Sequence, residues 1–552
     1  MKRLALPLVL TALPFAYLLA LSWTPTDAGV QLPLFDDAMI SMTYARTLAE
    51  GHGLVWYPGA EPVEGFTNLL WTLWMAGLHF ALGDGAITSA LVTLTGFAAL
   101  AYNLREQAAL GDQLGMSESA IRASLLMTGA SFPLAFWTAR GMEVGIAAAL
   151  VTAACVESIR YSRGGGNVLT LALITVALFA LRPEMIALTA PVWLFALASA
   201  QPRRRVLLVA GGALAAALMA GITLWRYTYY GDVVPNTFYL KATGVDLGVR
   251  AMTGLYWFCD TVAFYLAPFL VITLAALPTL PPPSRGHALL FAMTAVTSLY
   301  SIWIGGDAWE WSTKFPNRYL SCVLPLFFVL AAAATDQVTA RSVRRVDVAV
   351  ALAIVLGLVA YAVFPSEYRL ALPGRFPTRQ AAAGGVAFLL AAGLIVTLSW
   401  RAHWRSLDWP VLIVAACLAV NVPAIGFAVK SDGFDVAIDR HLTREGLALR
   451  RMLPADSSLG VTYAGSICYY SRLRCVDLYG KSDRHIARMP AVDPVFYPGH
   501  NKFDLHYSLA IVAPDYVDGL PRDADPASYG YNRVEVGGFP LYRRATPLER
   551  AR

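Results

Sequence analysis

Charged residues are scarce in this chain, and their scarcity excludes an ordinary soluble domain. Asp, Glu, Lys and Arg make up only 14% of the 552 residues, whereas hydrophobic residues make up 57%. The mean hydropathy is +0.53, which is far above that of a soluble globular protein. The composition therefore indicates a polytopic α-helical membrane protein.

Cysteine is also scarce, and a nucleotide-binding loop is missing. Six cysteines are too few for a disulfide framework, and four of them lie in or beside apolar runs, as small hydrophobic residues do: Cys155, Cys259, Cys322 and Cys417. The sequence has no G-x-x-x-x-G-K-[ST] segment that could cradle a nucleotide. The formal net charge of +6 comes from short basic clusters between apolar runs, which is typical of membrane topology signals and not of nucleic-acid binding.

About thirteen apolar runs are long enough to cross a bilayer. The first, "MKRLALPLVLTALPFAYLLALSW", begins with basic residues like a signal peptide, but its apolar stretch of about 20 residues predicts a retained helix with its N-terminus in the cytoplasm. The other runs lie near 87–104, 118–135, 142–159, 167–181, 185–200, 206–226, 252–277, 288–304, 319–336, 346–364, 380–400 and 410–429.

The basic clusters orient these runs by the positive-inside rule. Clusters such as Arg203 to Arg205 fall in alternate loops, which we expect to face the cytoplasm. If the segment 66–82 also crossed, every later cluster would lie outside. We therefore expect this segment, with Trp71 and Trp74, to lie at the interface within an outer loop over 24–85. An ordinary short crossing is the alternative.

The sequence changes character after Lys430. The stretch "DVAIDRHLTREGLALRRMLP" predicts an amphipathic helix, and "SLGVTYAGSICYY", "RCVDLYG" and "YSLAIVAPDYV" predict strands. We therefore divide the chain into a transmembrane domain, 1–430, and a soluble α/β domain, 431–552, which the odd number of crossings places on the periplasmic side. Cys468 and Cys475 could form a disulfide in that oxidising space.

Most of the unusual charged motifs fall on the outer side in this topology. Ionisable residues at membrane depth cost several kcal/mol unless they are paired or hydrated, so several together predict a functional site. Plainer interpretations stay open: Glu143 and Glu184 as helix-end ion-pair partners, Tyr230 as an interfacial anchor, and Asp36 or Asp37 as a helix N-cap.

Carboxylates and cations together at the outer face suit one reaction in particular. Nucleotides are scarce outside the cytoplasm, so a sugar transferred there would arrive on a lipid phosphate. An acceptor hydroxyl would attack the anomeric carbon while a carboxylate takes its proton. Arg and Lys would stabilise the leaving phosphate, which is largely anionic at neutral pH. A transporter or flippase of a lipid-linked glycan is the alternative function, because charges in a helix bundle also mark substrate pathways.

Eight blocks of sequence, in the same order, resemble the GT-C superfamily of polyprenyl-phosphate-dependent glycosyltransferases. They are "DD", "GHGLVWYPGAEPVEGFTNLLW", "ARGMEVG", "LRPEM", "YYGDVVPNTFYLK", "GGDAWEWSTKFPNRYL", "DLYGKSDRHIA" and "PGHNK". Within the superfamily, the order of the blocks is most similar to the mycobacterial terminal β-arabinofuranosyltransferase and its relatives. "GFTN" and the shorter tail depart from that pattern, which leaves the acceptor and the sugar open.

The resemblance implies an inverting transfer of arabinofuranose, or a similar sugar, from a decaprenyl-phosphate donor to a hydroxyl of a glycan, lipid or protein. It implies a multi-pass enzyme in the bacterial inner (plasma) membrane, in contact with membrane lipid, with its active site facing the periplasm. The acid pair would be catalytic: Asp36 and Asp37. The expected substrate-binding residues are Glu64, Glu143, Arg182, Glu184, Tyr230, Lys241, Asp307, Lys314, Arg318, His500 and Lys502.

Within this set, we assign roles from the local sequence. Asp36 follows the apolar "LPLF" and is our choice for the general base, and Asp37 is expected to cap the helix that follows. Arg318 is expected to hold the lipid phosphate, because arginine offers bidentate geometry to phosphate oxygens. Lys314, Lys241 or Arg182 would help it. We expect no required metal or other cofactor, although paired acids could ligate a divalent ion.

Overall fold

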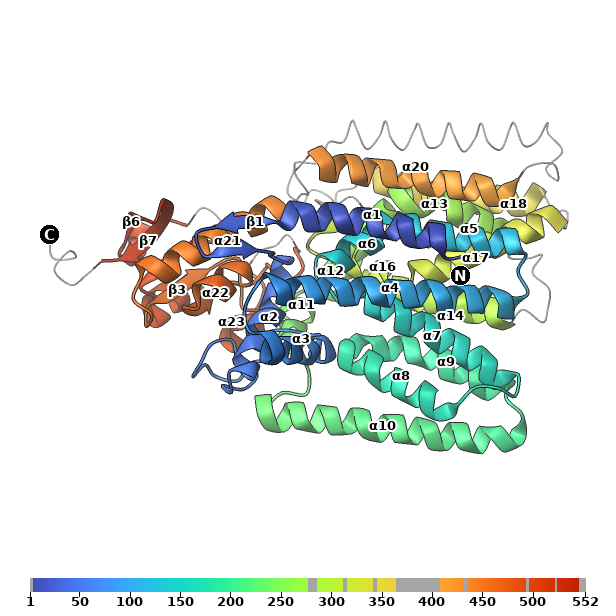
Figure 1. Ribbon diagram of the computed structural model, residues 1–552, viewed down its shortest axis with the longest axis horizontal. Helices are drawn as coiled ribbons and strands as arrows, with labels where there is room; N and C mark the ends of the chain where they lie inside the picture. The colour runs from blue at the N-terminus through green and yellow to red at the C-terminus, as the bar shows by residue number, and fades with distance from the viewer. Residues whose placement is uncertain are drawn as a thin grey trace.

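The computed structural model describes residues 3–276, 285–310, 315–340, 345–363, 408–430, 435–492, 496–521 and 524–545. A bundle of roughly parallel helices is joined at one end to a small α/β domain (Figure 1). The first helix starts at the end of the bundle that is remote from this domain, and the C-terminus lies beyond the sheet.

The helices of the bundle coincide with the apolar runs of the sequence. They are α1 (Ala5–Ser22), α4 (Ala86–Leu114), α5 (Glu118–Ala130), α6 (Phe132–Ala139), α7 (Val144–Ser162), α8 (Val168–Leu181), α9 (Ile186–Ser199), α10 (Pro202–Tyr230), α12 (Leu247–Thr261), α13 (Ala267–Ala276), α14 (Arg285–Ile304), α17 (Leu324–Ala340), α18 (Arg345–Val363) and α20 (Trp409–Lys430). A π-helical turn, η2 (Val262–Leu266), joins α12 to α13. The predicted run at 380–400 lies outside the described residues.

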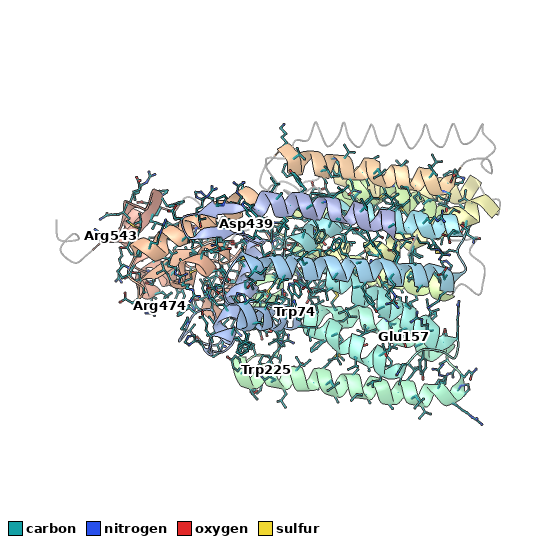
Figure 2. The ribbon with its side chains drawn as sticks, in the orientation of Figure 1. Trp74, Glu157, Trp225, Asp439, Arg474 and Arg543 are labelled. Atoms are coloured by element: carbon teal, nitrogen blue, oxygen red, sulfur yellow. A yellow bond between two sulfur atoms is a disulfide. The ribbon has the colours of Figure 1, made fainter. Side chains whose placement is uncertain are left out.

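The chain is a multi-pass membrane protein. Within the described ranges, seven helices of at least 18 residues are long and apolar enough to cross a membrane. Trp74 and Trp225 lie near the end of the bundle that meets the α/β domain (Figure 2), as expected of aromatic residues at a membrane interface. The bundle thus has the composition and layout that the apolar runs predict.

Helix α7 lies at the centre of the bundle, and most of its side chains are buried. It packs against α4 and α6 where small residues allow a close approach. A Cβ added at Gly145 would lie 2.5 Å from the Thr138 methyl carbon, and one at Gly96 would lie 2.7 Å from the same atom. Small residues at such contacts let neighbouring helices in a membrane pack backbone to backbone.

The end of the bundle next to the α/β domain is built from the segment after α1. A hairpin of β1 (Thr24–Thr26) and β2 (Gly29–Gln31) leads into α2 (Asp36–Ala49), and a loop then leads to α3 (Leu69–Leu82). Helix α3 has 14 residues, a length of about 21 Å, which is too short for a hydrocarbon core of about 30 Å. The interfacial location of 66–82 stays a prediction.

The α/β domain contains α21 (Asp435–Met452) and a five-stranded sheet. Its strands are β3 (Ser458–Val461), β4 (Arg474–Asp477), β5 (Tyr516–Val517), β6 (Tyr531–Val536) and β7 (Phe539–Arg544), in the order β4-β3-β5-β7-β6. Strand β3 is parallel to β4 and β5, and β7 is antiparallel to β5 and β6. The remaining elements are α22 (Ser466–Ser471), α23 (Arg484–Arg488), the π-helical η6 (His506–Val512) and the 3-10 helix η7 (Pro526–Tyr529).

Two of the predicted strands are only partly strands. "SLGVTYAGSICYY" forms β3 over its first four residues, but Ser466–Ser471 is helical because buried contacts to α2 hold the start of α22. "YSLAIVAPDYV" is largely the π-helical η6, and only Tyr516–Val517 pairs in the sheet. In both cases packing against neighbouring elements overrides the local preference for strand.

The α/β domain is attached to the bundle by buried charges. Arg140, at the end of α6, forms a buried salt bridge with Asp439 of α21 and also donates a hydrogen bond of 3.0 Å to the Pro33 carbonyl. Arg46 of α2 donates a hydrogen bond of 2.5 Å to the Tyr469 carbonyl of α22. The junction between the two parts is therefore a fixed interface.

Candidate active site

A polar cavity lies at this junction. Its walls come from α2, the loop before α3, the start of α7, α11 (Asn236–Ala242), the short helix α16 (Arg318–Ser321) and two loops of the α/β domain. The cavity brings together most of the expected site residues: Asp37, Glu143, Arg182, Lys241, Asp307, Arg318 and His500. Residues up to 463 positions apart in sequence therefore line a single cavity.

Asp37 lies between two cations. Its carboxylate accepts a hydrogen bond of 2.8 Å from Arg318 Nη1 and one of 2.7 Å from Lys481 Nζ. Arg318 also donates to both carboxylate oxygens of Asp307, at 2.7 and 2.8 Å. Burial by itself would raise the pKa of Asp37, but Lys481 and Arg318 outweigh it and hold this pKa well below its usual range. Asp37 is therefore ionised, and it faces the cavity.

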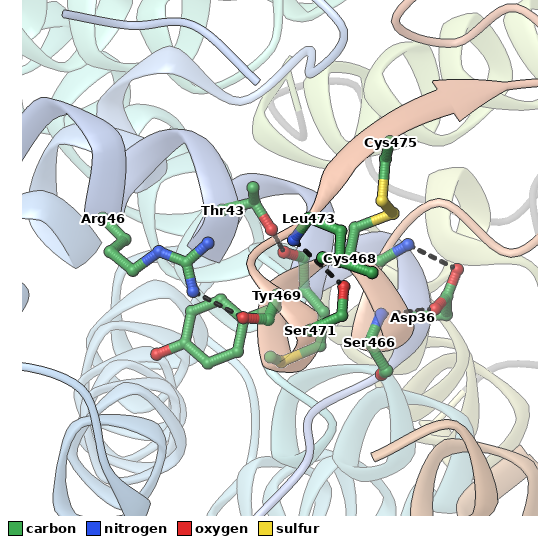
Figure 3. The surroundings of a disulfide bond; sticks show 11 residues. Asp36, Thr43, Arg46, Ser466, Cys468, Tyr469, Ser471, Leu473 and Cys475 are labelled. Carbon is green, nitrogen blue, oxygen red and sulfur yellow. Dashed lines mark hydrogen bonds between the residues drawn. A yellow bond between two sulfur atoms is a disulfide. The ribbon is translucent and has the colours of Figure 1, made fainter. Parts of the chain in front are cut away.

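Asp36 points in a different direction, toward the start of α22. Its carboxylate accepts hydrogen bonds from the backbone N–H groups of Ser466 (2.7 Å) and Gly465 (3.2 Å) at the start of α22 (Figure 3). Asp36 is only 4% exposed, and burial raises its pKa to about 6 although the nearby Lys481 opposes this shift. Asp36 therefore fixes the α/β domain to α2 and does not line the cavity.

The expectation that Asp37 caps the following helix is wrong. Helix α2 begins at Asp36, and its N-cap residue is Phe35, which provides no side-chain cap. Both acids thus lie in the first turn, where a carboxylate is still favoured by the helix dipole. Successive residues of a helix point about 100° apart, so the two side chains reach different neighbours.

A disulfide joins helix α22 to strand β4 of the α/β domain, close to α2. Cys468 of α22 is bonded to Cys475 of β4, with 6.1 Å between their Cα atoms (Figure 3). Strand β4 ends at Asp477, whose carboxylate accepts hydrogen bonds from the N–H groups of Gly480 (3.1 Å) and Ser482 (2.8 Å). The element that holds Asp36 is therefore covalently tied to the strand whose following turn presents Lys481 to Asp37.

A second cluster of charges surrounds Arg182. Arg182 pairs with Glu143 and donates a hydrogen bond of 2.6 Å to Glu184. Asn68 donates a hydrogen bond of 2.8 Å to the other oxygen of Glu143. The helix-end pairing considered for both glutamates is therefore present, and it keeps Arg182 at the cavity wall.

Lys241 differs from the other cations of the cavity. Its Nζ donates to the Tyr319 hydroxyl at 3.3 Å, and among the described residues no carboxylate lies within salt-bridge distance of it. Arg182, Arg318 and Lys481 are each paired with an acid. Lys241 is thus the cavity cation that is most available to a ligand anion.

His500 also lines the cavity. Burial is the main cause that lowers its pKa to about 3, so the ring is neutral at physiological pH. The ring nitrogen Nδ1 lies 3.2 Å from the Pro498 carbonyl. His500 therefore contributes a hydrogen-bonding group and no charge.

Four further expected site residues, Glu64, Glu184, Tyr230 and Lys502, do not line this cavity. Glu64 pairs with Arg226 (3.1 Å), and burial raises the pKa of Glu64 to about 7. Tyr230 packs against Tyr229 and donates to the Leu54 carbonyl at 3.3 Å. Lys502 donates to the carbonyls of Ala487 (2.7 Å) and Tyr239 (2.9 Å) and so joins the α/β domain to α11. Glu184 lines a neighbouring groove, and Lys314 lies outside the described residues.

The neighbouring groove is mainly apolar and measures about 330 Å³. It continues from the cavity, because Thr67, Arg182, Thr237 and Lys241 line both spaces. Away from these residues its lining is mostly aliphatic and aromatic side chains: Ile186, Ala187, Val234, Phe238, Trp303 and Ile304. Two cations thus stand where an apolar groove opens into a polar cavity.

Sequence reasoning missed Lys481. It belongs to the quoted block "DLYGKSDRHIA", and the available signal was a lysine in a turn directly after a predicted strand on the outer side. In the described ranges no group of three or more His, Cys, Asp or Glu side chains could hold a metal ion. The expectation that no metal is required stays a prediction.

The chain has the GT-C fold, a multi-pass bundle with a C-terminal α/β domain, and two solved structures are similar to it. Both are ArnT from Cupriavidus metallidurans. The structure bound to undecaprenyl phosphate matches with a TM-score of 0.53 and 12% identity over 98% of each chain. The apo structure matches with a TM-score of 0.52 and 12% identity over 97% of each chain. At this identity the likeness shows the fold alone.

Sequence comparison adds one match. Residues 436–542 match the family described as "Domain of unknown function (DUF8728)", and these residues cover nearly the whole described α/β domain. No curated protein sequence matches the chain. The domain that supplies Lys481 and the contacts to Asp36 is therefore one that recurs in other proteins.

Proposed function

We propose that this protein is an inverting glycosyltransferase that moves a sugar from a polyprenyl-phosphate donor to an acceptor hydroxyl at the outer face of the membrane. The observation that carries the proposal is the position of Asp37, an ionised acid in a cavity that opens into an apolar groove. The likeness to ArnT, which has been solved with undecaprenyl phosphate, supports the same class of donor.

In this proposal, the apolar groove holds the polyprenyl chain and its cationic end holds the phosphate. Lys241 meets the phosphate first, because it is free of acids among the described residues, and Arg182 lies beside it. Arg318 has a different role from the one the sequence suggested. Three of its nitrogens already donate to Asp37 and Asp307, so it positions the acid.

Asp37, and not Asp36, is the general base in this proposal. The acceptor oxygen attacks the anomeric carbon from the face opposite the phosphate. The bond between that carbon and the phosphate oxygen breaks, and its electron pair leaves with the lipid phosphate. The acceptor proton passes to the Asp37 carboxylate, and the attack from the opposite face inverts the anomeric centre.

The low pKa of Asp37 makes it a weak base while Lys481 and Arg318 contact it. A donor phosphate in the cavity would compete for these cations and so weaken their hold on Asp37. The pKa of Asp37 would then rise toward the range in which a carboxylate accepts a proton. Donor binding thus prepares the base to take the proton of the acceptor hydroxyl.

The finer identity follows the order of the sequence blocks. We propose decaprenyl-phosphate-arabinofuranose as the donor, the bacterial inner membrane as the location and the periplasm as the side of the reaction. The cations of the cavity provide the stabilisation that a metal would otherwise supply to the leaving phosphate. Activity that is abolished by EDTA and restored by one divalent ion would contradict this part.

The test is a single-turnover reaction of the purified full chain with radiolabelled decaprenyl-phosphate-arabinofuranose and a cell-envelope extract as acceptor. We expect labelled product from the wild type and from Asp36→Asn, and none from Asp37→Asn. Product from Asp37→Asn at the wild-type rate would remove Asp37 from the reaction. Transfer from another polyprenyl-phosphate sugar but not from this one would keep the reaction and change the sugar.

A further inference from the structure

A larger cavity lies on the outer side of the molecule, between the loop after α2 and the α/β domain. It measures about 700 Å³ and shares no lining residue with the catalytic cavity or the apolar groove. Its lining includes the aromatic residues Trp56, Tyr57 and Tyr507 and the charged residues Asp483, Arg484 and Arg488. We call this space the outer groove, and the reaction above assigns it no role.

Several side chains of the outer groove are held by contacts to one another or to the neighbouring Asp232. The Tyr507 hydroxyl donates to Asp483 at 3.2 Å, and the His485 ring stacks on the Tyr507 ring with 4.1 Å between centroids. Arg488 pairs with Asp232 at 2.6 Å. The groove therefore presents flat, rigid aromatic and guanidinium surfaces that need little ordering when a ligand binds.

Only a thin wall separates the outer groove from Asp37. Lys481 lines the catalytic cavity, and the next residue, Ser482, lines the outer groove. The Tyr44 hydroxyl lies 3.3 Å from the Ser482 hydroxyl and donates to the Val63 carbonyl at 2.8 Å. A Cβ on Gly65 would lie 2.4 Å from the Ser482 hydroxyl oxygen. A ligand in the groove would thus end against hydroxyl groups that border the catalytic cavity.

The chemistry of the outer groove indicates what it binds. Sugar rings offer apolar C–H faces edged by hydroxyl groups, and such faces pack well on aromatic rings beside planar polar groups. The groove also has an apolar part, lined by Ala60, Val63, Val476, Met489 and Val512. Three acids line the groove, Glu61, Asp477 and Asp483, against two arginines, Arg484 and Arg488, which disfavours a polyanion. Its volume lies within the usual range for ligand pockets and accommodates several sugar rings.

We propose that the outer groove binds the carbohydrate part of the acceptor, as a neutral oligosaccharide anchored beside the wall of Ser482 and Gly65 that borders the catalytic cavity. This inference rests on the proposed glycosyl transfer. It names the acceptor as a glycan and distinguishes it from a protein acceptor. Tyr57 and His485 are the groove residues best suited to a test, because both are partly or fully exposed and neither lies in the catalytic cavity.

The experiment uses the purified full chain on a printed array of defined neutral and anionic oligosaccharides, with a printed peptide set beside it. We expect the wild type to bind neutral oligosaccharides, and Tyr57→Ala and His485→Ala to bind them at least about tenfold more weakly, since an aromatic contact of this size is worth such a factor. The matched control is Tyr227→Ala, which removes a tyrosine that is 57% exposed on α10 and should bind like the wild type.

Binding of undecaprenyl phosphate is measured on the same samples, and it should be unchanged in the groove variants. No binding to any printed oligosaccharide, binding to peptides alone, or equal binding by wild type and groove variants would overturn the acceptor groove. Oligosaccharide binding without binding of undecaprenyl phosphate would leave the groove standing and overturn the proposed donor.

Discussion

The two sides of α2 use the same residue type for different purposes. On the cavity side, Asp37 is held by the side-chain cations Arg318 and Lys481. On the other side, Asp36 is held by backbone N–H groups at Gly465 and Ser466. Side-chain cations can move toward a ligand phosphate, whereas backbone groups within a packed element cannot. In the proposed reaction the Asp37 carboxylate must be freed from its partners, and these are side-chain cations. The Asp36 carboxylate keeps its place, and its partners are backbone N–H groups.

The change with the largest expected effect removes the charge on the cavity side. Asp37→Asn keeps the size of the side chain but cannot accept a proton, so the single-turnover transfer rate should fall by about 10²–10⁴-fold. Binding of undecaprenyl phosphate should persist. Equal loss in Asp36→Asn, with its fold intact, would contradict the division of roles between the two sides of α2.

A smaller effect is expected from removing the charge of Lys241, which forms no salt bridge among the described residues. Lys241→Met keeps much of the side-chain length but removes a charge-assisted contact to the donor phosphate, which should weaken binding of undecaprenyl phosphate by about 10–100-fold. The control is Lys430→Met at the exposed end of α20, which should bind normally. Unchanged affinity in Lys241→Met, measured by titration in detergent, would exclude Lys241 from the phosphate site.

The sequence predicts the bundle well, because apolar runs in a membrane carry their own length requirement. It also predicts that acids and cations gather at one end. Which of two adjacent acids faces the cavity depends on where the α/β domain sits, and that domain is separated from α2 by most of the chain. Lys481 and Asp37 are 444 positions apart in sequence, and no local sequence pattern near either residue predicts their contact.

Short elements were predicted less well for the same reason. "SICYY" has the alternating pattern of a strand, yet it forms α22 because Asp36 accepts hydrogen bonds from its first N–H groups. The place of Asp36 and Asp37 after "LPLF" does not by itself decide which of them lines the cavity. Distance along a helix says little about direction, because one residue turns the side chain by about 100°.

A third and smaller effect is expected from removing the disulfide. This bond joins α22, which holds Asp36, to β4, which leads to Lys481. Replacing both cysteines with Cys468→Ser and Cys475→Ser should destabilise the α/β domain by about 2.5 kcal/mol on loop entropy alone. We expect a lower melting temperature and slower transfer. The control is a reducing agent, which should lower the melting temperature of the wild type but not that of the double variant. A reductant effect of equal size on both would place the cause elsewhere.

The smallest expected effect is a pH dependence that separates the two acids. Burial raises the pKa of Asp36 from 3.8 to about 6 on folding, so between these values the folded chain binds more protons than the unfolded one at this site. The contribution of Asp36 to stability should therefore fall as the pH rises from about 4 to about 6 and stay constant above that. Asp37 has a lowered pKa, so its contribution to stability is present above about pH 4 and is lost only as the pH falls below this value.

Melting temperatures of the wild type, Asp36→Asn and Asp37→Asn, measured from pH 4.5 to 8, test the difference. The gap between wild type and Asp36→Asn should change up to about pH 6 and then remain level, and the gap between wild type and Asp37→Asn should be level throughout. The reverse pattern would show that Asp37 has the raised pKa and that Asp36 has the lowered one.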